Sequence, residues 1–469
     1  MTGNSSYYYY LAFLNYFKGG CLEIDPASIT KDSDDILVYH YGFPHTNTGV
    51  YLSVLLKLII IWVRANKDKL DLAPIILSID NKNIKKYIDH QVIWKVLNTT
   101  LYHPINNDLV VPFHQKISVN EPVQKYCGKI ILRWDQCHSV PPKICDNKGI
   151  HNPCNLNKDA QNSFHKSGGE SIIRRVIALP RRKRSFQEDM LDTCVKSDWV
   201  TISRPAFKNN LFLEVELPRP RELTMSTIVQ GNGLIKDNHL YPKLIENTEN
   251  YLVRVYPCPL RHSNSSNYSA FKYLWHGIQF IALNFQHFDY YLALYLAFFQ
   301  TTNRHAVALK PKNRYLMVTN ALQKVQISLT GLTDIQEIKV CDYLRKKMEV
   351  IKRTKVEKDI VFEYTYHTLF PVLVLSTKVN SRKYYYYCNL THLPFRTTLE
   401  WTHYSHPSIP FSNRDLNSYF KTYDFESGDS VDPFYDYLIS DLPLFNQESS
   451  PILGAHSEIV IQKKNRSVI

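Results

Sequence analysis

Two hydrophobic patterns alternate along the first 135 residues. Residues 52–64 form an apolar run long enough for a buried helix, whereas residues 73–79 (APIILSI) and 129–132 (KIIL) are short runs typical of buried strands. Residues 250–317 repeat the mixture, with LVRVYP as a strand ahead of the apolar stretch IQFIALNF. Strands that alternate with helices favour a parallel α/β sheet or barrel.

The pattern changes in the other segments. Residues 136–195 are polar, punctuated by Pro and Gly pairs and basic at 181–184 (RRKR), which predicts a flexible basic linker. Residues 318–402 hold short β-type runs such as PVLVLSTKV and KYYYYCNL, which favour a small β-sandwich. Residues 403–469 show no sustained periodicity, and we expect a loosely ordered tail.

Composition narrows the class of protein. With 44% hydrophobic residues among 469, the chain is not mainly disordered. The long apolar run 280–299 contains Asn284, Gln286, His287 and Asp289, so it does not predict a membrane span. Nine scattered cysteines indicate a reducing compartment, and the first 20 residues do not resemble a signal peptide. We therefore expect a cytoplasmic protein, soluble or peripheral to a membrane.

The net charge of +13 suits a polyanionic partner, whether nucleic acid, an anionic membrane face or a phosphorylated small molecule. No nucleic-acid recognition module accompanies the RRKR run, so a solvated charge run in the linker is favoured there and nucleic acid is not expected. GxxxxGK[ST], CxxC and GxSxG motifs are absent, and the Cys and His residues between 137 and 154 fit no standard zinc spacing.

Acidic and imidazole side chains follow three N-terminal strand segments. Glu23 and Asp25 share one face of a strand because strand side chains repeat every two residues. His40 follows the apolar VY, and Asp80 follows the buried IILSI. Taken one at a time, each has an ordinary structural interpretation: a solvated carboxylate at a strand end, a surface histidine for His40 and a helix N-cap for Asp80. Together, three carboxylates at the strand ends of a barrel would suit an oxygen-seeking cation such as Ca²⁺.

Five ordered motifs downstream carry a family resemblance. The chain contains RVYP at 254–257, SSNY at 265–268, WHGIQ at 275–279, ALNFQ at 282–286 and ALKP at 308–311. In order and spacing they resemble the Y half of the catalytic barrel of eukaryotic phosphoinositide-specific phospholipase C. Upstream segments resemble the X half of that family: TGNSS at 2–6, GGCLEID at 19–25, VYHYG at 38–42, APIILSIDN at 73–81 and GKIILR at 128–133. VCDYL at 340–344 resembles a motif of the C2 domain.

The resemblance implies an α/β fold: a TIM-barrel-like catalytic domain built from X and Y halves, followed by an all-β C2-like sandwich. The implied segments are the X half without its first strand (1–135), the X/Y linker (136–195), the Y half (196–317), the C2-like sandwich (318–402) and the tail (403–469).

The resemblance also implies roles for seven residues. Glu23, Asp25 and Asp80 match calcium ligands, with Glu23 also the base toward the inositol 2-hydroxyl, and His40 matches the acid that protonates the diacylglycerol oxygen. Arg133 and Arg254 match phosphate-binding positions, and Tyr256 matches a residue that packs on the inositol ring. The implied activity is calcium-dependent hydrolysis of phosphatidylinositol 4,5-bisphosphate to inositol trisphosphate and diacylglycerol, at the inner face of anionic membranes.

The chain departs from the family at several positions. The family's HNTYL segment, with a second catalytic histidine and an asparagine ligand, has no counterpart before Thr2. Asp80 stands where the family usually has glutamate, and Asp135 stands where it has a second phosphate-binding lysine. An insertion follows His40, so His45 is an alternative for the catalytic histidine. Ser203 is the nearest candidate for the family residue on the strand before RVYP. The alternatives are a catalytically impaired lipid-binding or scaffold protein, or a truncated sequence of the active enzyme.

Overall fold

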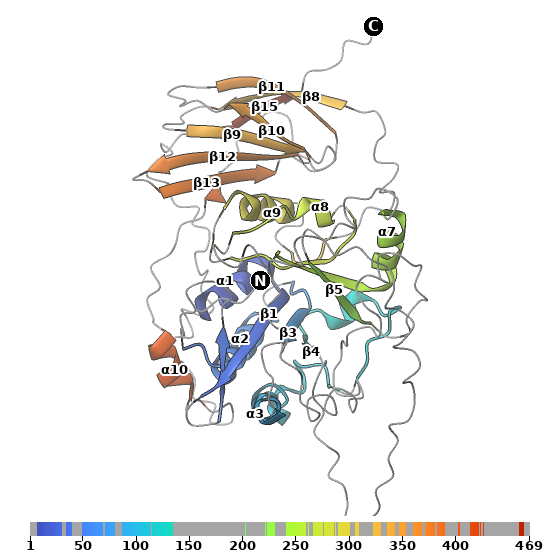
Figure 1. Cartoon of the computed structure of the whole chain (residues 1–469), viewed down its shortest axis with the longest axis vertical. Helices are drawn as coiled ribbons and strands as arrows, with labels where there is room; N and C mark the ends of the chain where they lie inside the picture. The colour runs from blue at the N-terminus through green and yellow to red at the C-terminus, as the bar shows by residue number, and fades with distance from the viewer. Residues whose placement is uncertain are drawn as a thin grey trace, which may run out of the picture.

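The chain folds into a mixed α/β part and an all-β part, which a computed structural model shows stacked along the long axis of the molecule (Figure 1). The structure describes residues 7–30, 34–39, 49–68, 71–79, 87–113, 115–134, 202, 221, 223–229, 241–258, 261, 266–274, 276–285, 287, 289–300, 305–308, 322–329, 335–342, 347–352, 360–367, 371–379, 382–389, 402–403, 413–421, 423, 425 and 459–463. The predicted linker 136–195 lies outside these residues.

The first sheet has four strands, three of which are parallel to one another. Its order is β2-β1-β3-β4, and β2 runs antiparallel to the far end of β1. The strands are β1 (Gly20–Ile29), β2 (Ile36–Tyr39), β3 (Ile75–Ile79) and β4 (Ile130–Trp134). The α-helices of this half are α1 (Tyr7–Phe17), α2 (Leu52–Asn66) and α3 (Tyr87–Val96). They are followed by the short π-helix η1 (Leu97–Leu101) and the 3-10 helices η2 (Pro104–Asn106) and η3 (Val123–Tyr126). The predicted strands over 73–79 and 129–132 and the predicted helix over 52–64 are confirmed.

The second sheet is parallel throughout, in the order β5-β6-β7. Its strands are β5 (Met225–Val229), β6 (Leu252–Tyr256) and β7 (Phe280–Ile281), and its helices are α7 (Tyr241–Asn250), α8 (Phe271–Leu274) and α9 (Tyr290–Gln300). A parallel bridge between Arg133 and Ile202 ties β4 to the chain beyond the linker. Two parallel sheets with helices outside them agree with the expected α/β class.

The start of β1 shows how local sequence places this strand. Gly19 has φ of +131°, and a Cβ atom there would lie 2.6 Å from the Ala73 carbonyl oxygen. Glycine therefore allows β1 to start in close contact with the segment leading into β3. Every residue of β3 is buried, as its nearly continuous apolar run IILSI predicts.

Two successive rows of side chains from these strands face a common interior. The first row is apolar, and its members pack in one cluster with their neighbours: Cys21, Ile76, Ile131, Met225 and Leu252. The second row lies two residues further along each strand: Glu23, Ser78, Arg133, Thr227 and Arg254. Because side chains repeat every two residues, both rows share one face, and the polar row lies nearer the carboxyl ends of the strands.

The all-β part consists of two antiparallel sheets, with the orders β10-β9-β12-β13-β14 and β11-β8-β15. Its strands are β8 (Leu322–Leu329), β9 (Ile335–Asp342), β10 (Lys347–Lys352), β11 (Ile360–His367), β12 (Pro371–Val379), β13 (Arg382–Asn389), β14 (Thr402–His403) and β15 (Ile459–Lys463). Helix α9 lies beside β12 and β13 and so separates this part from the parallel sheets (Figure 1). The assignment of these sheets to a C2-like sandwich stays a prediction.

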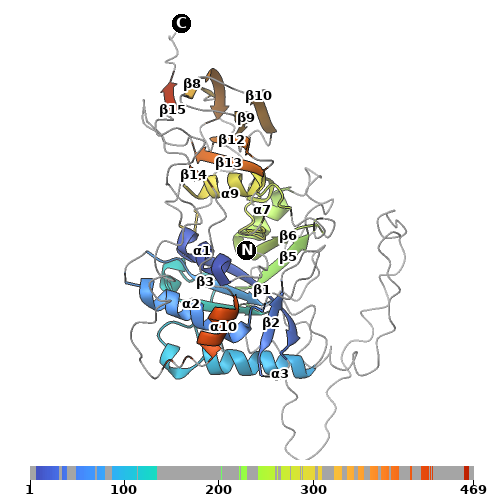
Figure 2. The ribbon, with the colours of Figure 1, turned by 90° about the vertical axis from the view of Figure 1, so that its left-hand side faces the viewer.

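Two segments of the tail are ordered. Helix α10 (Asn413–Lys421) returns to the first half and packs on α2 (Figure 2), and β15 pairs with β8. The expectation of a loosely ordered tail does not hold over these segments. Leu416 and Phe420 are four residues apart and buried, a stripe too short to stand out as sustained periodicity. Among all described helices, none is long and apolar enough to cross a bilayer.

Candidate active site

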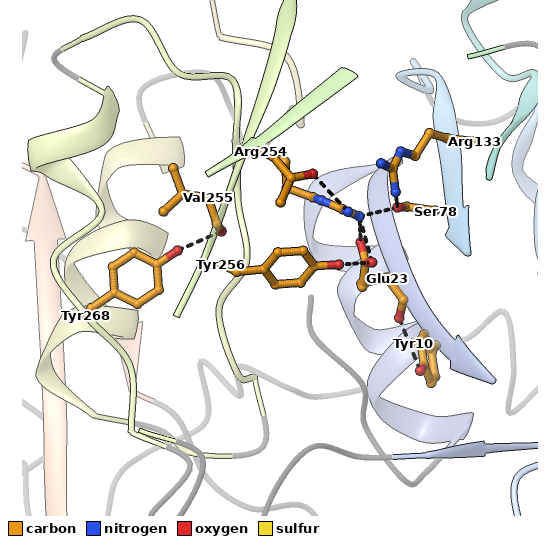
Figure 3. Close-up of polar contacts among 9 residues, drawn as sticks. Tyr10, Glu23, Ser78, Arg133, Arg254, Val255, Tyr256 and Tyr268 are labelled. Carbon is orange, nitrogen blue, oxygen red and sulfur yellow. Dashed lines mark hydrogen bonds and ion pairs between the residues drawn. The ribbon is translucent and has the colours of Figure 1, made fainter. Parts of the chain in front are cut away.

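The polar row centres on the buried carboxylate of Glu23 on β1. Arg254 on β6 donates through Nη1 to both carboxylate oxygens, at 2.6 Å for Oε1, and the Tyr256 hydroxyl donates to the same Oε1 (Figure 3). The Arg254 and Glu23 side chains are 1% and 3% exposed. Tyr256 follows Arg254 by two residues on β6, and its ring centroid lies 4.4 Å from the Arg254 Cζ atom, so both side chains face Glu23.

Ser78 on β3 joins two buried arginines. Its Oγ accepts hydrogen bonds from Arg254 Nη1 at 2.5 Å and from Arg133 Nη1 at 3.2 Å (Figure 3). Arg254 Nη2 also donates to Thr227 Oγ1 at 3.2 Å. The row thus gathers two guanidinium groups around the Ser78 hydroxyl, and one of them pairs with the Glu23 carboxylate. This arrangement is suited to an additional anion because guanidinium forks match phosphate and carboxylate geometry.

The apolar row behind the site offers no nucleophile. Burial, together with a smaller contribution from the negative charge of Glu23, raises the pKa of the Cys21 thiol to about 11. Cys21 is therefore a protonated thiol at neutral pH, and a thiol is a poor nucleophile. Among the described side chains of the two rows, the carboxylate, guanidinium and hydroxyl groups are therefore the ones suited to chemistry at neutral pH.

Motif residues of the second half hold β6 in place. The Gln279 amide accepts from the Val253 N–H at 2.9 Å and donates to the carbonyls of Thr248 at 2.7 Å and Tyr251 at 3.1 Å. The buried Tyr268 hydroxyl donates to the Val255 carbonyl at 2.9 Å (Figure 3). These contacts fix the backbone on both sides of Arg254, so the conformation of the arginine depends on them.

Asn267 from the SSNY segment holds the backbone of the chain that follows β7. Its side chain donates to the carbonyls of Asn284 at 3.0 Å and His287 at 2.8 Å, and accepts from the Asn284 N–H at 2.6 Å. SSNY and ALNFQ therefore meet in space, although Asn267 and Asn284 are 17 residues apart in the chain. Several residues that carry the resemblance are scaffold residues.

The structure describes five of the seven predicted site residues. It brings Glu23, Arg133, Arg254 and Tyr256 together around Ser78, and it places Asp25, which is 4% exposed, two residues beyond Glu23 on β1. His40 and Asp80, with the further candidates His45, Asp135 and Ser203, lie outside the described residues. Within the described part of the chain, no group of three or more His, Cys, Asp or Glu side chains gathers as a metal site. The predicted calcium site therefore stays a prediction.

Sequence reasoning missed Ser78 and Thr227. Both are small polar residues inside otherwise apolar strands, IILSI and MSTIV, and each lies level with a site residue in the parallel register. A hydroxyl at a buried strand position needs a hydrogen-bond partner, and here the arginines provide it. The position of Ser78, two residues before Asp80, was the available signal.

Comparisons with known proteins agree with this architecture. Residues 210–313 match the family model "Phosphatidylinositol-specific phospholipase C, Y domain". A Saccharomyces cerevisiae protein, 1-phosphatidylinositol 4,5-bisphosphate phosphodiesterase 1, is 37% identical over 95 residues, which span 19% of this chain and 11% of that protein.

Two solved structures share the fold. The crystal structure of L. pealei PLC21 matches with a TM-score of 0.52 and 15% identity, over 85% of this chain and 52% of that chain. The crystal structure of S. officinalis PLC21 matches with a TM-score of 0.51 and 16% identity, over 94% of this chain and 58% of that chain. The chain thus spans little more than half the length of these structures and a smaller share of the yeast protein. The matched Y domain, the yeast relative and the shared fold confirm the resemblance of this chain to eukaryotic phosphoinositide-specific phospholipases C.

Proposed function

We propose that this chain is a phosphoinositide phospholipase C that hydrolyses phosphatidylinositol 4,5-bisphosphate in anionic membranes to inositol trisphosphate and diacylglycerol. The observation that carries the proposal is the polar row: Glu23 lies among Arg133, Arg254 and Tyr256 at the carboxyl ends of parallel strands. Active sites of α/β barrels lie at that end. The cytoplasmic, membrane-peripheral location is proposed with it, since a chain of charge +13 is attracted to an anionic membrane face.

Arg254 and Arg133 would bind the phosphates of the inositol ring. Both are buried and share the Ser78 hydroxyl, which holds their guanidinium groups near each other. A phosphate entering the row would compete with Glu23 for Arg254, because both anions match the same fork. Ring-phosphate binding would thereby draw Arg254 from the carboxylate and leave Glu23 available as a base.

The chemical step follows from these roles and from the resemblance. Glu23 takes the proton of the inositol 2-hydroxyl, whose oxygen attacks phosphorus, while the bond from phosphorus to the diacylglycerol oxygen breaks. His40 gives that oxygen its proton. Water then opens the cyclic phosphate. Tyr256 packs against the inositol ring and, through its hydroxyl, orients the Glu23 carboxylate.

The two described carboxylates fit a calcium ion in their chemistry. Glu23 and Asp25 are buried and alternate on one face of β1, and carboxylate oxygens are the donors that Ca²⁺ prefers. Glu23, Asp25 and Asp80 are the residues that would hold the ion. When bound, calcium would lower the pKa of a coordinated hydroxyl and offset charge on the phosphate.

One observation favours a second candidate, a lipid-binding protein without turnover. Glu23 is engaged by both Arg254 and Tyr256, so its basicity depends on whether substrate displaces these partners. A chain in which they stay in place would bind phosphoinositides and not cleave them.

Turnover distinguishes the two candidates. We would incubate the full chain with vesicles of phosphatidylserine and phosphatidylcholine containing labelled phosphatidylinositol 4,5-bisphosphate, and measure water-soluble inositol phosphate with calcium and with a chelator. The proposal expects release that the chelator abolishes. Vesicle binding without release would support the lipid-binding candidate, and neither binding nor release would refute both.

A further inference from the structure

The tail helix α10 is fastened to the first half of the molecule through the side chain of Asn417. Its amide nitrogen donates to the carbonyl of Gly49, and its amide oxygen accepts from the hydroxyl of Tyr7 on α1. Gly49 has φ of +67°, a conformation that favours glycine and presents this carbonyl just before α2. One side chain from the tail therefore joins two segments that are distant from it in the sequence.

The Tyr7 hydroxyl extends the junction. It accepts the N–H of Tyr51 at 2.7 Å while it donates to Asn417. Burial raises the pKa of Tyr7 well above its ordinary value, so the hydroxyl keeps the proton that the bond to Asn417 requires. Tyr7, Gly49, Tyr51 and Asn417 thus form one hydrogen-bonded cluster, in which Tyr7 is buried and the other three are half-buried; we call it the Asn417 junction.

Two routes lead from the Asn417 junction to β1. Along one, Tyr51 pairs with Leu37 and the Val38 N–H donates to the Val50 carbonyl at 2.8 Å, so the junction holds β2, which places Tyr39 opposite Asp25. Along the other, α1 carries both Tyr7 and Tyr10, and the Tyr10 hydroxyl donates to the Glu23 carbonyl at 3.4 Å (Figure 3). Both routes end on the segment of β1 that carries the two site carboxylates.

Helix α10 has anchors besides Asn417. Lys57 on α2 donates through Nζ to the carbonyls of Phe420 at 2.9 Å and Tyr423 at 2.6 Å, which lie at the carboxyl end of the helix where acceptors are in excess. Leu416 and Phe420 are buried in the main core. Figure 2 shows the helix lying along α2. The loss of the Asn417 amide should therefore leave α10 docked.

We propose that Asn417 is a positioning residue of the candidate active site. Through Gly49 and Tyr7 it sets where β2 and α1 hold β1, and hence where Glu23 and Asp25 lie relative to Arg254. The inference rests on the proposed function, because it assigns Asn417 to the same site. A carboxylate base is sensitive to such placement, since small errors in position reduce catalysis strongly.

The test uses Asn417→Ala and Tyr7→Phe in the full chain. Ser418→Ala is the matched control, because Ser418 is an exposed neighbour on the same helix whose hydroxyl donates to the Arg414 carbonyl at 3.0 Å. We would measure kcat and KM on phosphatidylinositol 4,5-bisphosphate vesicles, together with the thermal unfolding midpoint. We expect Asn417→Ala and Tyr7→Phe each to lower kcat about 10-fold, with KM and vesicle binding unchanged. The double variant should lose little more than either single one, since both act through one junction.

The outcomes separate positioning from stability. A lower unfolding midpoint with wild-type kcat in the folded protein would overturn the inference, as would independent, multiplying losses in the double variant. If Asn417→Ala fails to fold, Tyr7→Phe serves as the test, because it keeps the buried ring and removes only the hydroxyl. Its kcat and unfolding midpoint then decide whether the junction positions the site. A wild-type chain without turnover would refute the catalytic proposal and this inference together, whereas an active wild type matched by both variants would refute the inference alone.

Discussion

The apolar and polar rows of the interior come from the same five strands, face the same way and differ by two residues in position. Cys21, Ile76, Ile131, Met225 and Leu252 make the first row, and Glu23, Ser78, Arg133, Thr227 and Arg254 the second. The first packs side chains against each other, and the second pairs charges across the interior. A shift of two residues along the strands therefore separates a layer that stabilises the fold from the layer to which we assign the proposed chemistry.

The two rows are expected to contribute differently to the free energy of folding. Burying apolar area stabilises the fold by about 25 cal/mol per Å². A buried ion pair is often no more stabilising than apolar residues of the same volume, although removal of one partner is costly. Arg133 and Arg254 are thus poorly explained by stability alone, and the comparison predicts different consequences for substitutions in the two rows.

Glu23→Gln should give the largest effect, because it keeps the volume of the side chain and removes the charge that pairs with Arg254. We expect turnover to fall by about 10²–10⁴-fold through loss of the base. Stability should fall by about 3–5 kcal/mol because a buried guanidinium loses its partner. Vesicle turnover and denaturant unfolding check the two effects. Glu121→Gln is the control, since that carboxylate pairs with Lys125 at the surface; equal loss in both variants would contradict a special role of Glu23.

Arg254→Lys should weaken binding of the inositol phosphate head group by about 10–100-fold. Lysine keeps the charge but not the fork that reaches Glu23, Ser78 and Thr227 at once, and a hydrogen bond to a charged group contributes about 1.5–3 kcal/mol. Calorimetric titration with soluble inositol 1,4,5-trisphosphate measures the change. Arg64→Lys on α2, whose guanidinium contacts Ile105 and Asn106, is the matched control; a wild-type affinity in Arg254→Lys would remove this arginine from the phosphate site.

Tyr256→Phe should have a smaller effect, because the ring stays beside Arg254 and the hydroxyl bond to Glu23 is lost. Because its acceptor is charged, that hydrogen bond contributes no more than about 3 kcal/mol. We expect a several-fold fall in kcat at unchanged vesicle binding. A fall in vesicle binding alone would show that Tyr256 acts at the membrane and does not orient Glu23.

Ile131→Val in the apolar row should give the smallest effect on function. It removes one buried methyl group and should cost about 0.5–1.5 kcal/mol of stability. Turnover should match the wild type at a temperature where the variant is folded. A loss of turnover comparable to that of Tyr256→Phe would mean that the two rows are not functionally distinct.

The elements of the first half could be predicted because β3, β4 and α2 are marked by nearly uninterrupted apolar runs. The alternation of Glu23 and Asp25, and of Arg254 and Tyr256, also predicted shared strand faces. The pairing of Glu23 with Arg254 spans 231 residues and depends on how the two sheets meet, which no local pattern encodes. Helix α10 was missed because two apolar residues and a lysine 363 residues earlier in the chain hold it in place.

The binding of a soluble head group tests the central claim most directly, namely that the polar row is a phosphoinositide site. Inositol 1,4,5-trisphosphate would be titrated into the wild-type chain, the Arg133→Met/Arg254→Met double variant and Ile131→Val, with folding checked for each. We predict saturable binding by the wild type and Ile131→Val that weakens with added salt, and its loss in the double variant. Equal binding by the folded double variant, or no binding by the wild type, would contradict the claim.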